Sequence, residues 1–263
     1  MARANRHYIS GYIWHITHRC HKKEFLLKLN RDRKRWLQWL FEAKKRYGLK
    51  ILNYIITSNH IHLLVVDDTI HNIIPKSLQL IAGRTGQEYN IRKKRKGAFW
   101  EDRYHATAIE SGKHLIQCLI YIHLNMVRAG VVKHPIEWKT SGYYEIMHPK
   151  TRYSLIDFSL LNELLNQDSI IDLQRINTEL VDEELQKENL TRDDKWSSSV
   201  AVGSKNFIEI IHHKLGMKTR GRKIKEHNGA YILREAEFSY NAHFDPKNDL
   251  LRAKNEYFLE LSI

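Results

Sequence analysis

The sequence is poor in cysteine and has no long apolar run, although it numbers 263 residues. Cys20 and Cys118 are its only cysteines and neither belongs to a CxxC pair, so the simplest interpretation is a reduced, cytoplasmic protein with two ordinary thiols. No apolar run approaches the ~20 residues that a membrane span needs. The basic start at Met1–Arg6 is not followed by the apolar stretch of a secretory signal. We therefore expect no membrane partner.

Negative charge is scarce in the first part of the chain. Residues 1–150 hold 27 Lys and Arg against 11 Asp and Glu, a net charge of +16, whereas residues 151–263 hold 16 against 19, a net charge of −3. A basic field of this size suits a polyanion, and nucleic acid is the commoner one where no amphipathic membrane anchor accompanies it. A solvated basic surface that only keeps the protein soluble is the alternative.

Apolar periodicity organises residues 1–150. Strands are expected at residues 12–17, 49–56, 61–66 and 104–110, helices at 30–47, 70–89 and 111–129, and a mobile basic loop at 92–97. The order strand, helix, strand, strand, helix, strand is that of the split βαβ pattern. We therefore predict an α+β fold of the ferredoxin-like or RRM-like type, an antiparallel sheet with helices on one face and an open face that can hold nucleic acid.

The pattern changes after Lys150. Helical segments are expected near residues 160–166, 173–187 and 207–215, followed by the basic stretch 218–225, which is either a DNA contact or a disordered linker. We predict two domains, residues 1–150 and residues 151–263. The second is expected to be mainly helical, and the sequence does not define its role.

His60 and His62 begin one of the expected strands. Because strand side chains alternate, both imidazoles face one side while Ile61 faces the other. Two imidazoles on one face can share a first-row divalent ion and leave room for a phosphate oxygen. A packed or surface histidine pair has the same spacing, so this motif alone does not decide.

The helix expected at 111–129 carries a polar stripe. Ser111 is expected as its N-cap and Gly130 as the αL residue after its last turn. Spacings of three and four residues stack the following side chains on one face: His114, Gln117, Tyr121, Asn125 and Arg128. Asn is a poor residue inside a helix, so its place one turn after Tyr121 indicates a contact to a ligand or a metal. A solvated helix face is the alternative.

Five segments between Tyr12 and about Tyr144 carry a resemblance: His15–Arg19, Ser58–Leu64, Phe99–Tyr104, Tyr121–Asn125 and Val127–Val132. In this order along the chain they resemble the HUH single-tyrosine transposases, most closely the REP-associated tyrosine transposases of bacteria. One departure is Met126, where family members commonly have proline. The helix is therefore expected to run straighter past Asn125.

The resemblance implies an HUH endonuclease fold and an enzyme of DNA transposition that nicks and rejoins single strands. It implies that His60, His62 and Asn125 hold a divalent metal, Mn²⁺ or Mg²⁺, and that Tyr121 is the nucleophile. A phenol has an ordinary pKa of about 10, so a metal-held phosphate in line with it would assist attack at neutral pH and give a 5′-phosphotyrosine. His123 is on the wrong side of Tyr121 to act as its base.

The family's substrates are single strands with short imperfect hairpins, such as repetitive extragenic palindromes (REP), so we expect such DNA as the partner and the nucleoid as the location. The cations expected to contact it are Arg31, Arg33, Lys34, Arg35, Arg92, Lys93, Lys94, Arg95, Lys96, Arg103 and Arg128. The aromatic residues Tyr12, Trp14 and Trp100 either stack on unpaired bases or belong to the core. A monomer and a homodimer both stay open.

Two other functions share these features. A domesticated relative that binds structured DNA or RNA without cutting it has the same fold and charge, but the presence of all four site residues argues against it. A replication initiator or conjugative relaxase shares the His-x-His and tyrosine chemistry, but the order of the motifs fits the transposases better. We therefore predict a single-tyrosine DNA transposase.

Overall fold

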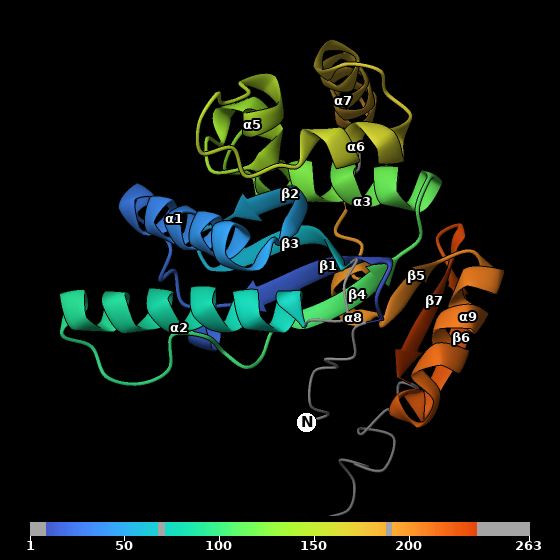
Figure 1. Ribbon diagram of the computed structural model, residues 1–263, viewed down its shortest axis with the longest axis horizontal. Helices are drawn as coiled ribbons and strands as arrows, with labels where there is room; N and C mark the ends of the chain where they lie inside the picture. Colours follow the sequence, from blue (N-terminus) through green and yellow to red (C-terminus); the bar gives the residue numbers. More distant parts are fainter. Residues whose placement is uncertain (1–8, 68–71, 188–190, 236–263) are drawn as a thin grey trace, which may run out of the picture.

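The computed structural model describes residues 9–67, 72–187 and 191–235, and their strands form one sheet in the order β2-β3-β1-β4-β5-β7-β6 (Figure 1). The strands are β1 (Tyr12–Arg19), β2 (Lys50–Ile56), β3 (His60–Asp67), β4 (His105–Ile109), β5 (Ala201–Gly203), β6 (Arg222–His227) and β7 (Ala230–Glu235). Within these ranges no helix is long and apolar enough to span a membrane. The α+β fold class is confirmed.

The first four strands form an antiparallel unit in which β3 pairs with β2 and β1, and β1 pairs with β4. Their register places Thr17 opposite His62 and His15 opposite Thr107. Because directly opposed residues point to the same face, these side chains share one face of the sheet with His60. His105, which is also opposite Thr17, points to the same face, so the strand pairing alone gathers four histidines on one surface.

Helix α1 (Asn30–Tyr47) has the predicted bounds and ends at Gly48, as predicted. Gly48 has a φ of +73°, a left-handed conformation that glycine adopts without a Cβ clash, and its N–H donates to the carbonyl of Lys44. Helix α2 (Ile73–Lys93) packs against α1, where the Glu88 carboxylate accepts hydrogen bonds from Arg35 and Trp39. In Figure 1 both helices lie in front of the sheet.

Helix α2 is longer at its C-terminal end than the sequence predicts. It runs to Lys93 and ends at Lys94, which has a φ of +50°. Arg92 is therefore helical, and it forms an ion pair with Asp32 of α1, which favours the extra turn. The predicted mobile loop at 92–97 is wrong for its first two residues. Ile70, expected in this helix, lies outside the described residues.

The helix predicted at 111–129 is in fact two helices, α3 (Lys113–His123) and α4 (Asn125–Arg128). Leu124 between them has a ψ of 6°, which is not helical. Gly112 takes the N-cap position in place of Ser111, with no side-chain cap. Gly130 follows α4 with a φ of +66°, as predicted. The prediction of one continuous helix over 111–129 is therefore wrong, because the chain breaks before Asn125, and this break does not depend on a proline.

Residues after Lys150 form helices and also extend the sheet. Helices α6 (Phe158–Leu165), α7 (Ile170–Leu185) and α9 (Lys205–Leu215) match the predicted helical segments, and α5 (Gly142–Met147) and the short α8 (Lys195–Ser198) accompany them. The 3-10 turns are η1 (His21–Lys23), η2 (Pro135–Glu137) and η3 (Gly216–Thr219). Strand β5 pairs in parallel with β4 and joins β7 and β6 to the sheet. The sequence predicted none of these three strands.

Helix α8 covers part of the face that the sequence left open. It contacts β1 and β4 and lies behind the sheet in Figure 1. The basic stretch 218–225, expected to be a linker or a DNA contact, runs from η3 into the strand β6. The sheet therefore continues from residues before Lys150 into residues after it.

A buried carboxylate, Glu145, ties the loop after α5 to the sheet. Its side chain accepts hydrogen bonds from the Tyr54 hydroxyl of β2, from the Ser154 hydroxyl, and from the backbone N–H groups of Leu155 and Ile156. Glu145 is only 1% exposed, and burial together with its carboxylate raises the pKa of Tyr54. Four donors therefore depend on one side chain.

We expect Glu145→Ala to lower the free energy of unfolding by about 3 kcal/mol or more, because buried donors left without an acceptor cost about 1–3 kcal/mol each. Glu145→Gln keeps one acceptor oxygen and is expected to lose less. Urea unfolding followed by circular dichroism measures both variants. Equal losses for the two would show that the accepting oxygens do not matter.

Candidate active site

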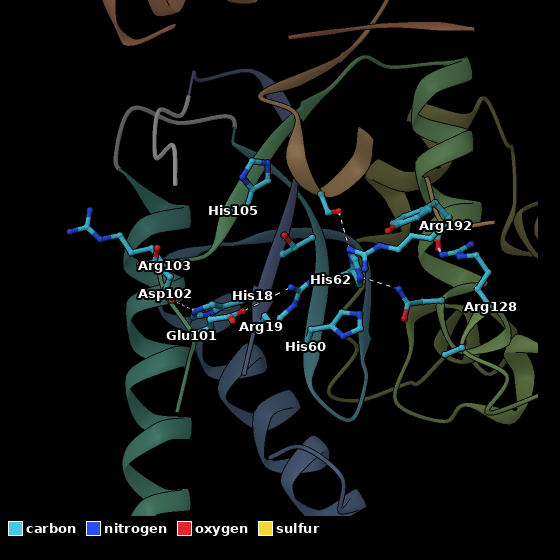
Figure 2. A pocket seen from close by; sticks show the side chains of 15 residues that line it. His18, Arg19, His60, His62, Glu101, Asp102, Arg103, His105, Arg128 and Arg192 are labelled. Carbon is cyan, nitrogen blue, oxygen red and sulfur yellow. Dashed lines mark hydrogen bonds and ion pairs between the residues drawn. The ribbon is translucent and has the colours of Figure 1, made fainter. Parts of the chain in front are cut away.

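A cavity of about 610 Å³ lies over the histidine-bearing face of the sheet. It is lined by all four residues that the sequence assigned to catalysis or metal binding: His60, His62, Tyr121 and Asn125. Figure 2 shows His60 and His62 side by side on β3, with Arg128 and Arg192 on one side of them and His18, Arg19 and Arg103 on the other. The structure therefore brings the four predicted residues together in one pocket.

Three elements position these four side chains. His60 and His62 come from β3 with their ring centroids 5.0 Å apart, and the Tyr121 ring, from α3, lies 5.7 Å from that of His62. The amide nitrogen of Asn125, on α4, lies 3.0 Å from Nε2 of His62. Asn125 also hydrogen-bonds the His60 side chain, so its amide lies between the two imidazoles.

The break at Leu124 frees the carbonyl of Tyr121 from the usual helical pattern. The Arg128 guanidinium donates to this carbonyl and lies over the Tyr121 ring, 4.3 Å from its centroid. Burial lowers the pKa of Arg128. A cation fixed on the ring face of a phenol is placed to stabilise negative charge that develops there.

The imidazoles of the site are uncharged at neutral pH. Burial lowers the pKa of His60 to about 4 and that of His15 to about 3, and it holds the pKa of His62 well below its usual range. Arg19 and Arg192 lower the pKa of His60 further by charge repulsion. Neutral imidazoles have a lone pair available for a metal.

Both predicted histidine ligands are held from behind by polar groups. Nδ1 of His60 lies 2.7 Å from Oδ1 of Asn59 and 3.0 Å from the Thr57 hydroxyl, in the turn between β2 and β3. Nδ1 of His62 lies 2.9 Å from Nε2 of His15. Such outer contacts fix the ring orientation of a metal-binding histidine.

The donor set fits a divalent first-row cation. Two neutral imidazoles and the Asn125 side chain, whose amide oxygen is the atom able to ligate a cation, lie together in the cavity, and cationic side chains that suit a phosphate line the space beside them. His60, His62 and Asn125 are therefore the residues that would hold the ion.

Sequence reasoning missed His15, Trp196 and Arg192. His15 lies in β1, where most of the neighbouring residues are apolar, so the sequence pattern indicated a strand with one apolar face. The alternation of strand side chains nevertheless places His15 on the same face as Thr17. Trp196 lies 6.1 Å from Tyr121, centroid to centroid, and Arg192 lines the cavity. No local signal marks Trp196 or Arg192, because tertiary packing brings the segment around α8 to the pocket.

Ten of the eleven cations predicted to contact DNA fall into two groups. Arg33 donates to the carbonyls of Leu27 and Lys28, and three others form ion pairs: Arg35 with Glu88, Arg92 with Asp32 and Arg95 with Glu24. Arg31, Lys34, Lys93, Lys94, Lys96 and Arg103 are exposed and make no ion pair with another described residue. Arg103 and Arg128 line the cavity. DNA contact by these residues remains a prediction.

The three aromatic residues considered for base stacking have protein partners. Trp14 is buried, the Tyr12 ring packs edge-on against Phe207, and Trp100 stacks on His18 and donates to the carbonyl of Ala82. His123, already judged unsuited as a base, is buried and hydrogen-bonded to Asn177. The contacts of these four side chains are therefore those of packing within the protein.

A second cluster, Asp193, Asp194 and His227, has ligand atoms within 4.8 Å of one another. Cations of the protein already neutralise it, because Lys195 pairs with Asp193 at 3.0 Å and Arg234 pairs with Asp194 at 2.6 Å. The ion pair with Arg234, which lies on β7, fastens the segment that carries Arg192 and Trp196 to the sheet. The ion pairs with Lys195 and Arg234 therefore account for the acidic residues of this cluster without a metal ion.

The fold and the cavity together define an α+β domain that presents histidines, a tyrosine and an asparagine on one face of an antiparallel sheet. Residues 8–125 match the family model described as transposase, IS200 like. This segment, a little under half of the chain, is therefore similar to the IS200-like transposases. Among the described site residues, the match includes His15, His60, His62, Tyr121 and Asn125 but ends before Arg128, Arg192 and Trp196.

Two solved structures are similar at low sequence identity. One is a REP-associated tyrosine transposase bound to a REP hairpin, with 19% identity, a TM-score of 0.45, and coverage of 57% of this chain and 87% of that one. The other is a transposase from Deinococcus radiodurans, with 13% identity, a TM-score of 0.33, and coverage of 49% of this chain and 97% of that one. No curated protein sequence matches the chain.

Proposed function

We propose that this protein is a single-tyrosine transposase that nicks and rejoins single-stranded DNA bearing REP-like hairpins, with a divalent metal and a 5′-phosphotyrosine intermediate. The observation that carries the proposal is the convergence of Tyr121, His60, His62 and Asn125 in one cavity. The match of residues 8–125 to the family model of the IS200-like transposases supports it. The hairpin substrate follows from the sequence resemblance and from the basic charge of residues 1–150.

In the proposed reaction the Tyr121 hydroxyl oxygen attacks the phosphorus of the scissile phosphodiester. A bond forms between this oxygen and phosphorus, the bond from phosphorus to the 3′ oxygen breaks, the phenol proton passes to solvent, and the 3′ oxygen takes up a proton. The ester keeps the energy of the broken bond, so a 3′ hydroxyl can reverse the reaction and rejoin a strand without ATP. A divalent ion would polarise a non-bridging phosphate oxygen.

The residues of the chain orient these groups. Arg128 fixes the phenol by its contacts with the ring and the backbone carbonyl of Tyr121. Arg128 and Arg192 line the same cavity and would neutralise phosphate charge there. His60, His62 and Asn125 would hold the metal and need no proton transfer of their own, because the imidazoles are neutral.

The test is covalent capture of DNA. Single strands from beside the protein's own gene that contain an imperfect palindrome are labelled at the 3′ end and incubated with the protein and Mn²⁺ or Mg²⁺. We expect a labelled protein–DNA adduct on a denaturing gel, absent with EDTA and absent with the same sequence as duplex. Tight binding to the hairpin strand without any adduct would favour the alternative, a domesticated protein that only binds structured nucleic acid.

A further inference from the structure

A chain of hydrogen bonds runs from the segment around α8 to the candidate metal ligand His62. Nδ1 of His15 lies 2.8 Å from the backbone carbonyl oxygen of Trp196, and Nε2 of His15 lies 2.9 Å from Nδ1 of His62. The two imidazoles are stacked, with centroids 5.0 Å apart and ring planes 10° from parallel. His15 is fully buried.

The chemistry of these groups fixes where each proton lies. A carbonyl oxygen can only accept, so Nδ1 of His15 carries a hydrogen and donates it to Trp196. No described carboxylate contacts either ring, and a buried imidazolium without a counter-ion is costly, so His15 is neutral and its Nε2 is an acceptor. Nδ1 of His62 must then be the donor in the bond between the two rings.

The same logic leaves Nε2 of His62 without a hydrogen. This atom lies 3.0 Å from the Asn125 amide nitrogen, inside the cavity, and its lone pair accepts from that amide. A metal ligand needs a lone pair at Nε2 that carries no hydrogen, and a histidine in the opposite tautomer would present an N–H there instead.

We propose that His15 is a positioning residue that holds His62 in its Nδ1–H tautomer, anchored by the Trp196 carbonyl, so that the Nε2 lone pair points at the metal position. The consequence for metal binding rests on the proposed function, whereas the tautomer itself does not. Trp196 lies outside the segment that matches the transposase family, so a part of the chain beyond that segment sets the chemistry of a ligand within it.

The tautomer is measured in the metal-free, full-length protein labelled with ¹⁵N-histidine, by long-range ¹H–¹⁵N correlation spectroscopy. The His62 signals are assigned by their loss in His62→Gln. We expect Nδ1 of His62 to be protonated and Nε2 to be unprotonated. Protonation of Nε2 with a bare Nδ1 would overturn the proposal, and this measurement needs no variant at His15.

Mn²⁺ affinity, measured by titration followed by electron paramagnetic resonance, gives a second readout. His15→Phe removes the acceptor, so we expect mixed tautomers of His62 and about 10–100-fold weaker Mn²⁺ binding, the usual effect of losing such an outer contact. In His15→Gln an amide oxygen can accept from His62 and an amide N–H can donate to Trp196, so most of the affinity and the tautomer should return.

Thr107→Val is the matched control for packing. The Thr107 hydroxyl donates to the Ser199 carbonyl at 2.7 Å and lies 3.3 Å from the same Trp196 carbonyl; it is equally buried, but it does not contact His62. We expect this variant to keep both the tautomer and the Mn²⁺ affinity. Unchanged tautomer and affinity in a folded His15→Phe would contradict the proposal, as would equal losses in Thr107→Val. Failure of the DNA adduct test alongside the expected tautomer would refute the proposed function and leave the positioning role standing.

Discussion

Tyr121→Phe is expected to abolish the covalent protein–DNA adduct, with strand cleavage reduced by at least about 10³-fold, while affinity for the hairpin strand stays nearly unchanged. The variant removes a single oxygen, the atom that would bond to phosphorus. The ring keeps its contacts with Arg128 and His62, so the cavity should keep its shape. Denaturing gels measure the adduct, and fluorescence anisotropy of labelled DNA measures binding.

Tyr144→Phe is the control for this experiment. Tyr144 lies on α5 and stacks on His148, and it does not line the cavity. Loss of its hydroxyl should leave adduct formation as in the unchanged protein. A Tyr121→Phe protein that still forms the adduct would exclude Tyr121 as the nucleophile, and parallel loss of binding and cleavage would indicate a role in holding DNA.

His62→Ala is expected to reduce metal-dependent cleavage on the order of 10³-fold, because a bound cation supplies several kcal/mol of charge stabilisation in phosphoryl chemistry. The same variant should lose most of its Mn²⁺ affinity. Binding of the hairpin strand should persist, since the exposed cations of α1 and α2 are untouched. Titration with Mn²⁺ in both the binding and the cleavage assay separates these effects.

The matched control is His105→Ala, which removes an imidazole from the same cavity. His105 hydrogen-bonds the backbone carbonyl of Ser199 and does not contact Asn125, so its loss should leave Mn²⁺ affinity close to that of the unchanged protein. Equal losses of Mn²⁺ affinity in the two variants would argue against a specific role of His62 in metal binding. Full cleavage by His62→Ala would remove the metal site from the mechanism.

Local patterns predicted the strand that carries the two candidate metal histidines and two of the elements around it. The alternation of β1 and β3, the apolar periodicity of α1 and the glycine that ends α1 are short-range signals, and each element lies within one or two residues of its predicted bounds. His60 and His62 point to the same face because side chains two residues apart in a strand always do, so this too could be predicted from the sequence.

The features that escaped prediction depend on distant contacts. No residue near Leu124 predicts a helix break. The backbone carbonyl of Tyr121 accepts a hydrogen bond from Arg128, seven residues further along the chain. Strand β6 has the sequence Arg-Lys-Ile-Lys-Glu-His, whose charge indicated either a linker or a DNA contact, yet pairing with β7 makes it the edge strand of the sheet. β5 has only three residues, too few to show a period.

The parallel pairing of β4 with β5 has a consequence for biosynthesis. The ribosome makes the chain from its N-terminus, so Tyr121 and both candidate metal histidines exist before the segment around α8 has been translated. Until that segment docks, β4 is an edge strand, paired with β1 alone, and the Nδ1–H of His15 lacks the Trp196 carbonyl as its acceptor. A nascent chain therefore holds every predicted catalytic residue before the pocket is complete. The pocket forms only after the segment around α8 has been translated and β5 has paired with β4, which lies far from it in the sequence.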